Sequence, residues 1–560
     1  MEMVNIKING MPLSVPNGIS ILEAARYAGI EIPTLCYLKD INEIGACRIC
    51  MVEVKGARSL VTACVYPVNE GMEVFTNTEK VRNSRKITLE LILSTHDRKC
   101  LSCVRSGSCE LQQLCKEFGV DDETRYEGAN PHYEFDDSAA HMIRDNNKCI
   151  LCRRCVAACD MQKISVIGAN ARGFDTHISS AFDKDLADVS CISCGQCIVN
   201  CPTGALVEKD DSDKVLAAIN DPEKYVIVQT APSIRATLGE CFGMSIGTNV
   251  QGKMVAALRR LGFDKVFDTD FAADLTIMEE AHEFIERVQQ GGVLPMITSC
   301  SPGWVKYCEH YYPDQISHLS TCKSPQQMFG ATIQNLVCEK RWGSIRRRSS
   351  SLASCPARRK KFETKRDDQS ASGYPDVDIA LTTRELARMI ESAGIYFKHL
   401  PDEEFDNPLG EGTGAAVIFG ATGGVMEAAL RTAVETLTGK ALDNVDFTDV
   451  RGMDGVKEAE YEVAGLKLKV AVASGTANAH TLMEQVKAGT SPYHFIEIMG
   501  CPGGCINGGG QPIQHAVVRN FVDLKNRRAA ALYDADRKLP VRKSHESEAI
   551  KTVYTEFFGE

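Results

Sequence analysis

Hydrophobic and polar residues alternate at the start of the chain with the period of a β-strand. Val4-Asn5-Ile6-Lys7-Ile8 alternates, Asn9-Gly10 is a strong hairpin turn, and Leu13 and Val15 resume the alternation. Ser20 is placed to cap a short helix over residues 21–27, which we expect to end near Gly29. The pattern predicts a small β-rich domain over residues 1–78.

The period changes to that of a helix over residues 79–98, where we expect Ile87, Leu91 and Leu93 to face inward. Residues 99–140 are polar and irregular, and residues 141–208 contain an internal repeat of about 42 residues. From residue 209, strands such as 225–228 alternate with helices such as 252–261. The chain is therefore expected to be a multidomain protein that combines α+β and α/β parts, with domains at 1–78, 79–140, 141–208 and 209–560.

Composition excludes several classes of protein. The chain has 560 residues, of which 44% are hydrophobic and 24% charged, so it can form several hydrophobic cores. A net charge of −11 argues against nonspecific binding to nucleic acid. No apolar run approaches the roughly 18 residues that a membrane span needs, and the first residues do not resemble a signal peptide. We expect a cytoplasmic protein that binds neither nucleic acid nor membrane.

Cysteine is the unusual residue. There are 24 cysteines, and sixteen of them precede residue 202. A disulfide framework is typical of small exported chains, which this chain is not. Closely spaced cysteine pairs in a reducing compartment favour metal ligation.

The repeat contains two similar cysteine runs, and each resembles the run of bacterial ferredoxins. In that run three thiolates two residues apart bind one cube, and the fourth cysteine reaches the other. Asp160 replaces the usual proline of the first run, and zinc, which usually takes two separated pairs of ligands, is the alternative. We expect two [4Fe-4S] clusters, one held by Cys149, Cys152, Cys155 and Cys201 and the other by Cys191, Cys194, Cys197 and Cys159.

Two further sets of ligands precede the repeat. The first lies in the β-rich domain, which resembles the [2Fe-2S] β-grasp domain of plant-type ferredoxins, although the first gap is longer than theirs and a zinc ribbon is the alternative. The second combines one imidazole with three thiolates and can hold another [4Fe-4S] cluster in a short helical segment. The expected ligands are Cys36, Cys47, Cys50 and Cys64 for the first set, and His96, Cys100, Cys103 and Cys109 for the second.

Two motifs carry a resemblance of the whole chain to the long, monomeric, clostridial type of [FeFe]-hydrogenase. They are Thr298-Ser299-Cys300-Ser301-Pro302-Gly303-Trp304 and the glycine-rich stretch from Glu497 to Pro512, which contains Cys501-Pro502-Gly503-Gly504-Cys505. Supporting blocks begin at Gln229, Lys323 and Phe419. The resemblance implies a catalytic domain over residues 209–560 that ends in helices like those of a small subunit.

The resemblance also implies a cofactor and roles for its neighbours. The family's H-cluster joins a [4Fe-4S] cube to a two-iron unit with CO, cyanide and a dithiolate amine. Cys501 would ligate the cube and Cys505 would bridge the two parts. Other implied roles are the lining of the two-iron unit by Met499, a hydrogen bond from Lys360 to a cyanide, and a proton relay through Glu280, Glu283 and Ser320.

The first motif departs from the family, which usually has two adjacent cysteines there, the first delivering protons and the second ligating the cube. Here Cys300 is followed by Ser301. Cys300 could ligate the cube after a small shift of the loop, with Ser301 near the proton route. Alternatively, Cys300 remains the proton donor and Ser301 is a poor oxygen ligand. We favour Cys300 as the ligand.

A second departure follows at residues 341–359, which are rich in Arg and Ser where the family has a buried strand and Met-Pro-Cys-Thr. Cys355 lies two positions before the site that Ala357 occupies. Our hypothesis is an out-of-frame stretch that returns to frame at Lys360, because family-like codons shifted by one base spell these residues. The alternative is a genuine basic insert. Sequencing of the gene tests the hypothesis, and the disrupted motif puts the activity of this chain in question.

The resemblance thus implies reversible formation of H2 by a ferredoxin-linked [FeFe]-hydrogenase. One [2Fe-2S] cluster and three [4Fe-4S] clusters would connect an electron partner, ferredoxin or flavodoxin, to the H-cluster, and maturation proteins would insert the two-iron unit. The chain is expected to be a monomer. Three alternatives remain: an H2 sensor, a subunit of an NADH-linked hydrogenase, and a non-catalytic electron-transfer or cluster-assembly protein.

Overall fold

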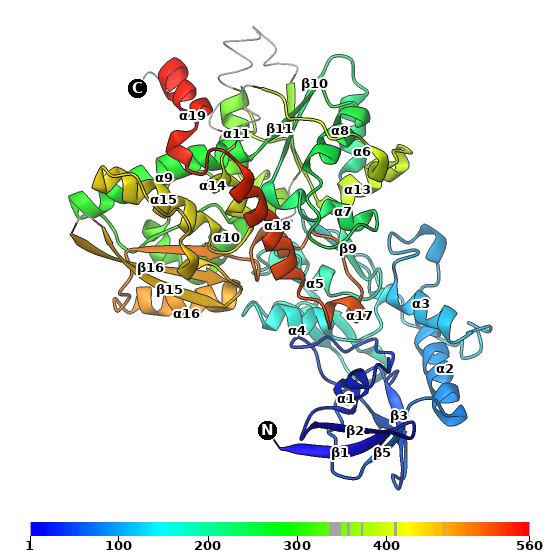
Figure 1. The fold of residues 1–560 in the computed structure, drawn as a ribbon. Coiled ribbons are helices and arrows are strands. Elements are labelled where there is room, and N and C mark those ends of the chain that lie inside the picture. The colour runs from blue at the N-terminus through cyan, green and yellow to red at the C-terminus, as the bar shows by residue number, and fades with distance from the viewer. Residues whose placement is uncertain are drawn as a thin grey trace. The chain divides into compact units, whose positions relative to one another are not determined.

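The chain divides into two compact units. The computed structural model describes residues 2–334, 349–354, 359–370, 373–407, 412–463 and 465–558. The first unit comprises residues 1–189, 200–208 and 513–522, and the second comprises residues 190–199, 209–512 and 523–560. Each unit is described separately below, and Figure 1 gives the element labels.

A five-stranded sheet begins the first unit, in the order β2-β1-β5-β3-β4. The predicted hairpin is confirmed: β1 (Met3–Ile8) and β2 (Met11–Pro16) pair antiparallel around Asn9 and Gly10, which both have positive φ. The predicted helix is also confirmed as α1 (Ile21–Tyr27), with a complete capping box between Ser20 and Glu23. β3 (Met51–Val54), β4 (Val61–Thr62) and β5 (Glu73–Phe75) complete the sheet.

The helix after this sheet, α2 (Glu79–Leu93), buries a different face from the one we expected. Ile87 and Leu91 are 41% and 50% exposed, so their expected inward position is wrong. Val81, Arg85 and Leu89 face inward instead. The Arg85 guanidinium donates hydrogen bonds to the backbone carbonyls of residues 49 and 51. Because these bonds satisfy its buried polar atoms, an arginine can occupy an inward position that hydrophobic periodicity assigns to an apolar side chain.

Short elements surround the cysteines of the remainder of the first unit. α3 (Glu110–Glu117) follows Cys109, and α4 (Arg154–Asp160) carries Cys155 and Cys159. Arg154, only 1% exposed, forms an ion pair of 2.9 Å with Glu110 and so joins these two helices. Two small antiparallel pairs flank α4, namely β6 (Met142–Arg144) with β9 (Leu206–Glu208), and β7 (Gly168–Asn170) with β8 (His177–Ser179).

The second unit contains a parallel sheet in the order β11-β10-β13-β14. The expected strand at 225–228 is confirmed within β10 (Tyr225–Thr230), and the expected helix at 252–261 is confirmed within α8 (Gln251–Leu261). The other strands are β11 (Lys265–Asp268), β13 (Ser349–Ser354) and β14 (Ile379–Leu381). Helices α8 and α13 (Thr383–Ser392) pack against it through a core that includes Met254, Leu258 and Leu386.

A second sheet of this unit has the order β12-β17-β16-β15. β12 (Met296–Ile297), β17 (Phe495–Met499) and β16 (Leu466–Ser474) are parallel, and β15 (Val456–Val463) is antiparallel to β16. Figure 1 shows α15 (Gly424–Thr438) and α16 (Thr476–Lys487) on opposite faces of this sheet. The carboxyl ends of β10, β12 and β17 lead into the residues of the candidate site.

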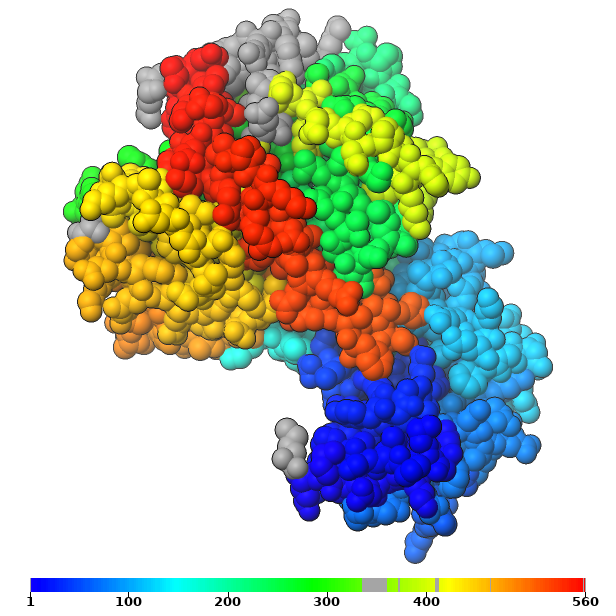
Figure 2. All heavy atoms as spheres, viewed as in Figure 1, coloured from blue at the N-terminus to red at the C-terminus, as the bar shows by residue number. Residues whose placement is uncertain are grey.

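The last described residues of the chain lie on the surface of the second unit, as Figure 2 shows in red. α18 (Leu524–Lys538) and α19 (Glu548–Val553) are the main elements. Within the described residues, none of the helices combines the length and the apolar character that crossing a bilayer demands.

Candidate active site

A cavity of about 80 Å³ in the second unit lies at the carboxyl ends of parallel strands. Pro232 follows β10, Cys300 follows β12 and Cys501 follows β17. In open α/β sheets this edge is the usual place for ligand binding. The cavity brings together six of the residues that the sequence predicted, namely Cys300, Ser301, Lys360, Met499, Cys501 and Cys505.

The glycine-rich loop after β17 holds Cys501 and Cys505 in a fixed turn. Gly504 has φ +94° and ψ −166°, and a Cβ there would lie 2.7 Å from the backbone nitrogen of Thr422, so only glycine fits. The Gly503 N–H donates to the Ser474 hydroxyl over 2.5 Å, and the Gln511 amide donates to the Cys505 carbonyl over 2.9 Å. Both sulfur-bearing residues are thus positioned before any ligand binds.

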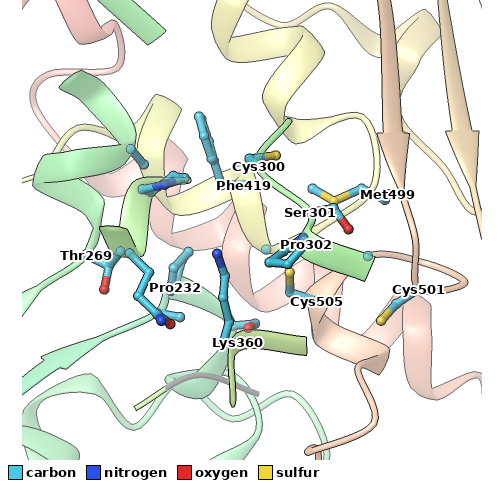
Figure 3. Close-up of a pocket in the computed structure, with 17 residues that line it drawn as sticks. Pro232, Thr269, Cys300, Ser301, Pro302, Lys360, Phe419, Met499, Cys501 and Cys505 are labelled. Atoms are coloured by element: carbon cyan, nitrogen blue, oxygen red, sulfur yellow. The ribbon is translucent and has the colours of Figure 1, made fainter. Parts of the chain in front are cut away.

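Hydrogen bonds to β17 and the residue after it position the first motif. The Ile498 N–H donates to the Thr298 hydroxyl and the Gly500 N–H donates to the Ser301 hydroxyl, each over 3.2 Å. Figure 3 shows Ser301 between Cys300 and Cys501. Burial, followed by the negative charge of Glu280, raises the pKa of the Cys300 thiol well above its ordinary value. Which of Cys300 and Ser301 would bind iron stays a prediction.

Lys360 enters the cavity from α12 (Arg359–Glu363), between Pro232 and Pro302 in Figure 3. It is 7% exposed, and its ammonium donates to the Glu363 carboxylate over 2.8 Å. The next residue, Lys361, forms ion pairs of 2.6 Å with Asp211 and Glu385 and so anchors the short helix. Cys355 and Ala357 lie outside the described residues, as do residues 341–348.

The cavity contains buried polar atoms whose hydrogen-bonding capacity is unused. Both side-chain atoms of Gln326, which is 4% exposed, and the hydroxyl of Ser233, which is 0% exposed, have no hydrogen-bond partner among the described residues. Buried polar groups normally have partners. Together with three thiols on the cavity wall, these atoms fit an inorganic group that carries small polar ligands, as the resemblance implies.

Two carboxylates of α9 (Asp270–Gln290) form an acidic chain near Cys300, with Glu280 buried and Glu283 partly buried. Glu280 is 1% exposed, and burial raises its pKa to about 7, against the lowering effect of Ser320. The Ser320 hydroxyl donates to Glu283 over 3.1 Å, and Glu283 pairs with Arg287 over 2.6 Å. The structure therefore brings together the three residues expected to relay protons.

Four thiols line a separate cavity in the first unit. Cys149, Cys152, Cys155 and Cys201 surround it, together with Ile178 and Pro202. This is the set expected to hold one [4Fe-4S] cluster, and its convergence fits that group. Cys159 belongs to the first unit, whereas Cys191, Cys194 and Cys197 belong to the second, so the second set of ligands stays a prediction.

The two N-terminal sets also fit metal clusters. The Sγ atoms of Cys50 and Cys64 are 3.3 Å apart, and the Cys47 N–H points at the Cys36 Sγ over 3.5 Å. Burial lowers the pKa of His96 to about 4, and its Nδ1 is buried without a hydrogen-bond partner among the described residues. No disulfide joins cysteines in the described part of the chain.

Sequence reasoning missed some residues of the cavity. Gln326 and Ser233 lie in the supporting blocks that begin at Lys323 and Gln229, to which the sequence assigns no role. Glu497, which is not among the cavity's lining residues, has no predicted role either. Its buried carboxylate accepts the N–H groups of Gly423 and Met426, each over 2.7 Å, and so fixes the start of α15 against β17. A polar residue within a continuous hydrophobic strand, such as Glu497, was the available indication.

Comparisons with known families match most of the chain. The model described as iron only hydrogenase large subunit, C-terminal domain, matches residues 224–509. The other matches are a 2Fe-2S iron-sulfur cluster binding domain at 1–79, an NADH-ubiquinone oxidoreductase-G iron-sulfur binding region at 85–124, a 4Fe-4S dicluster domain at 148–213 and an iron hydrogenase small subunit at 522–560.

Individual relatives agree with these matches. The NADP-reducing hydrogenase subunit HndD of Solidesulfovibrio fructosivorans is 49% identical over 100% of this chain and 96% of its own length. Iron hydrogenase 1 of Clostridium pasteurianum is 42% identical over 100% of this chain and 97% of its own length. A solved structure of a variant of apo [FeFe]-hydrogenase HydA1 from Chlamydomonas reinhardtii has a TM-score of 0.55 and 39% identity, and covers 62% of this chain and 94% of that one.

Proposed function

The chain belongs to the [FeFe]-hydrogenase family, and from this premise we propose that it catalyses the reversible formation of H2 from two protons and two electrons. The observation that carries the proposal is the cavity on which Cys300, Cys501 and Cys505 converge near a chain of acidic residues. The match to the hydrogenase large-subunit domain supports it.

Within the proposal, the chain's own residues hold and surround an H-cluster. Cys501 and Cys505 supply two thiolates, Cys300 supplies a third with Ser301 beside it, and Met499 shapes the wall. Lys360, Gln326 and Ser233 offer hydrogen bonds to polar ligands of the group. The H-cluster, when bound, supplies the redox chemistry, and the protein supplies ligands, orientation and exclusion of water.

The acidic chain delivers the protons. A proton taken up at Glu283, which is held by Arg287, passes through the Ser320 hydroxyl to Glu280 and from there toward Cys300. A pKa of about 7 lets Glu280 accept and release a proton near neutral pH. Burial keeps this carboxyl from exchanging freely with solvent.

The N-terminal half conducts electrons. We assign one [2Fe-2S] cluster to Cys36, Cys47, Cys50 and Cys64, and [4Fe-4S] clusters to the His96 set and to the two ferredoxin-type runs. The matches to 2Fe-2S and 4Fe-4S domains support these types of cluster. The cavity lined by Cys149, Cys152, Cys155 and Cys201 supports one ligand set by its geometry.

The electron partner has two candidates. Ferredoxin or flavodoxin would suit a chain that acts alone, whereas the similarity to HndD, an NADP-reducing hydrogenase subunit, favours an NADP-linked complex. The five family models that match the chain describe hydrogenase and iron–sulfur domains. We expect the purified chain to exchange electrons with reduced ferredoxin but to reduce NADP+ only when a flavoprotein partner is added.

The decisive test is spectroscopic. The chain is matured anaerobically and its infrared spectrum is recorded beside an iron count and an assay of H2 evolution from reduced methyl viologen. CO and cyanide bands with H2 evolution support the proposal. Bands with only a minute catalytic current in film voltammetry would favour an H2 sensor, and a chain that binds iron without such bands would be an electron-transfer or cluster-assembly protein.

A further inference from the structure

The segment between the two ferredoxin runs folds over the first cluster cavity. β7 and β8 pair antiparallel, with Ala169 opposite Ile178. Ile178 is 2% exposed and lines the cavity beside Cys149, Cys152, Cys155 and Cys201. The inner side of this hairpin is therefore a wall of a proposed [4Fe-4S] site.

Three aromatic rings on segments that contact this hairpin are exposed. Phe135, Phe174 and Phe182 are 63%, 62% and 93% exposed. Phe182 has φ of +59°, a backbone region that is unfavourable for a phenylalanine, whereas its neighbour Asp183, at +54°, is of a type that adopts this region more readily. The strained backbone at Phe182 presents a large ring to solvent and adds nothing to the core, and such features point to function.

His177 joins the segments that carry these rings. Its Nδ1 lies 2.9 Å from the Asp175 carbonyl oxygen, its Nε2 lies 2.7 Å from the Asp183 carboxylate, and its ring is 5.2 Å from that of Tyr133. Each exposed phenylalanine is thus within two residues of a group that contacts the imidazole. We call the surface formed by Phe135, Phe174 and Phe182 the hairpin face.

Further hydrogen bonds fix this surface to the cluster site. The Leu186 N–H donates to Asp136 over 3.2 Å, which joins the two chain segments. The Asn147 amide donates to the Tyr133 carbonyl over 2.7 Å, and Asn147 belongs to the short helix just before Cys149. The hairpin face and the cavity are consequently parts of one ordered region.

The rim of the hairpin face is acidic. We define this rim as the exposed charged residues within 133–138 and 171–188, which carry the three rings. It has two cations, Arg172 and Lys184, and six carboxylates, which are Glu134, Asp137, Asp175, Asp183, Asp185 and Asp188. Like charges repel at interfaces, whereas opposite charges accelerate encounter. At this face the rim disfavours an acidic partner such as a small ferredoxin, whose exchange of electrons with the chain would use another surface, and it favours a partner with a basic surface.

We propose that the hairpin face is a docking site for a one-electron redox protein whose basic rim surrounds an apolar recess, and that electrons pass there to or from the [4Fe-4S] centre of Cys149, Cys152, Cys155 and Cys201. This rests on the proposed function for the existence of that centre. In each encounter the reduced centre loses one electron and the partner's redox group gains it, and no proton moves. The exposed rings provide the apolar anchors of the interface.

The test uses cytochrome c, a basic one-electron acceptor, as the probe. The full reconstituted chain is reduced anaerobically, freed of reductant and mixed with oxidised cytochrome c in a stopped-flow instrument over a range of salt concentrations. We expect the second-order rate constant to fall steeply with salt. A small acidic ferredoxin, used as the comparison acceptor, should show the weaker reaction at this site.

Two variants and two matched controls locate the site. Phe182→Asn removes the ring but keeps a residue that tolerates positive φ, and should lower the rate constant about tenfold, as loss of an interface anchor does. Asp185→Lys should lower it several-fold at low salt and flatten the salt dependence. Leu101→Asn, at a residue 102% exposed beside Cys100, and Glu31→Lys, at another exposed site, should change neither.

The outcomes separate the two proposals. Electron paramagnetic resonance of the reduced chain first establishes whether the [4Fe-4S] centres are present. If they are absent, both the proposed function and this electron route are overturned. If they are present but oxidation is insensitive to Phe182→Asn and Asp185→Lys, or responds to Leu101→Asn instead, the docking site alone is overturned.

Discussion

The pKa of Glu280 is raised mainly by burial of its carboxyl group. Its folded-state pKa of about 7 lies above the ordinary 4.5, so the folded chain holds this proton more tightly than the unfolded chain does. Ionisation therefore removes stability as the pH rises from about 4.5 to 7, and by linkage the loss is on the order of 3 kcal/mol above that range.

We predict that Glu280→Gln stabilises the fold in alkali and stops proton delivery. The gain in the free energy of unfolding should be near zero below the ordinary pKa and largest above pH of about 7, measured by urea denaturation across pH. H2 evolution should fall by about a hundredfold or more. A gain that does not vary with pH would contradict the assignment of the raised pKa.

The pair Cys300 and Ser301 allows a second test at the scale of single residues, namely which of the two binds iron. A serine hydroxyl is a weaker iron ligand than a thiolate, and Ser301 lies on the cavity wall. Because the proposal takes Cys300 as the third thiolate, we predict that Cys300→Ser speeds the loss of iron to a chelator by about ten- to a hundredfold, whereas Ser301→Cys leaves the rate unchanged. Ser299→Cys, at a residue whose hydroxyl instead donates to the Cys322 carbonyl, is the control and should also leave the rate unchanged. Slower loss of iron in Ser301→Cys alone would show that position 301, rather than Cys300, binds iron.

Individual residues show why sequence predicts some parts of a site and not others. The cysteines were predictable because the spacing of thiolates reflects the shape of a cluster. The inward face of α2 was not, because Arg85 finds carbonyl partners that lie far away in the sequence. The exposed Phe182 was equally unpredictable, since positive φ at a phenylalanine has no pattern in the sequence.

At the scale of elements, α12 depends on ion pairs rather than on its length. It has five residues, and Lys361, 3% exposed, joins it to Glu385 at the start of α13 and to Asp211. A helix this short is not stable alone. The position of Lys360 in the cavity is therefore a consequence of the contacts of its neighbour.

We predict that Lys361→Met lowers the free energy of unfolding by about 3–5 kcal/mol, because it leaves the fully buried Glu385 without a charge partner. Denaturation by urea measures the change. Lys365→Met, at an exposed position just after the same helix, should cost little. If both variants unfold alike, the ion pairs do not hold α12 in place.

Regular elements were predictable where local chemistry agrees with the fold. The capping box of Ser20 and Glu23 defines the start of α1, and β10 was visible as a hydrophobic run. β13, which lies in the middle of the parallel sheet, has no strand pattern of its own, because residues 349–354 are rich in serine; only the resemblance to the family indicated a strand there. The backbone pairing there is set by β10 and β14 on either side.

At the scale of the molecule, the ligands of one cavity come from both repeats. Cys149, Cys152 and Cys155 belong to the first run and Cys201 to the second. We predict that Cys201→Ala removes about four iron atoms per chain and one [4Fe-4S] signal from the resonance spectrum. Cys115→Ala, at a cysteine outside the predicted ligand sets, should keep the full iron count. A full count in Cys201→Ala would contradict the exchange of ligands between runs.

That shared cavity has a consequence for biosynthesis. As the polypeptide leaves the ribosome, the first three sulfurs emerge well before the last one, so an iron–sulfur cube inserted early would have an open corner facing oxidants and competing chelators. Loading of this cavity is expected to wait until translation has passed Pro202. Slow codons between the two runs should then reduce the yield of holoprotein, although the amino-acid sequence is unchanged.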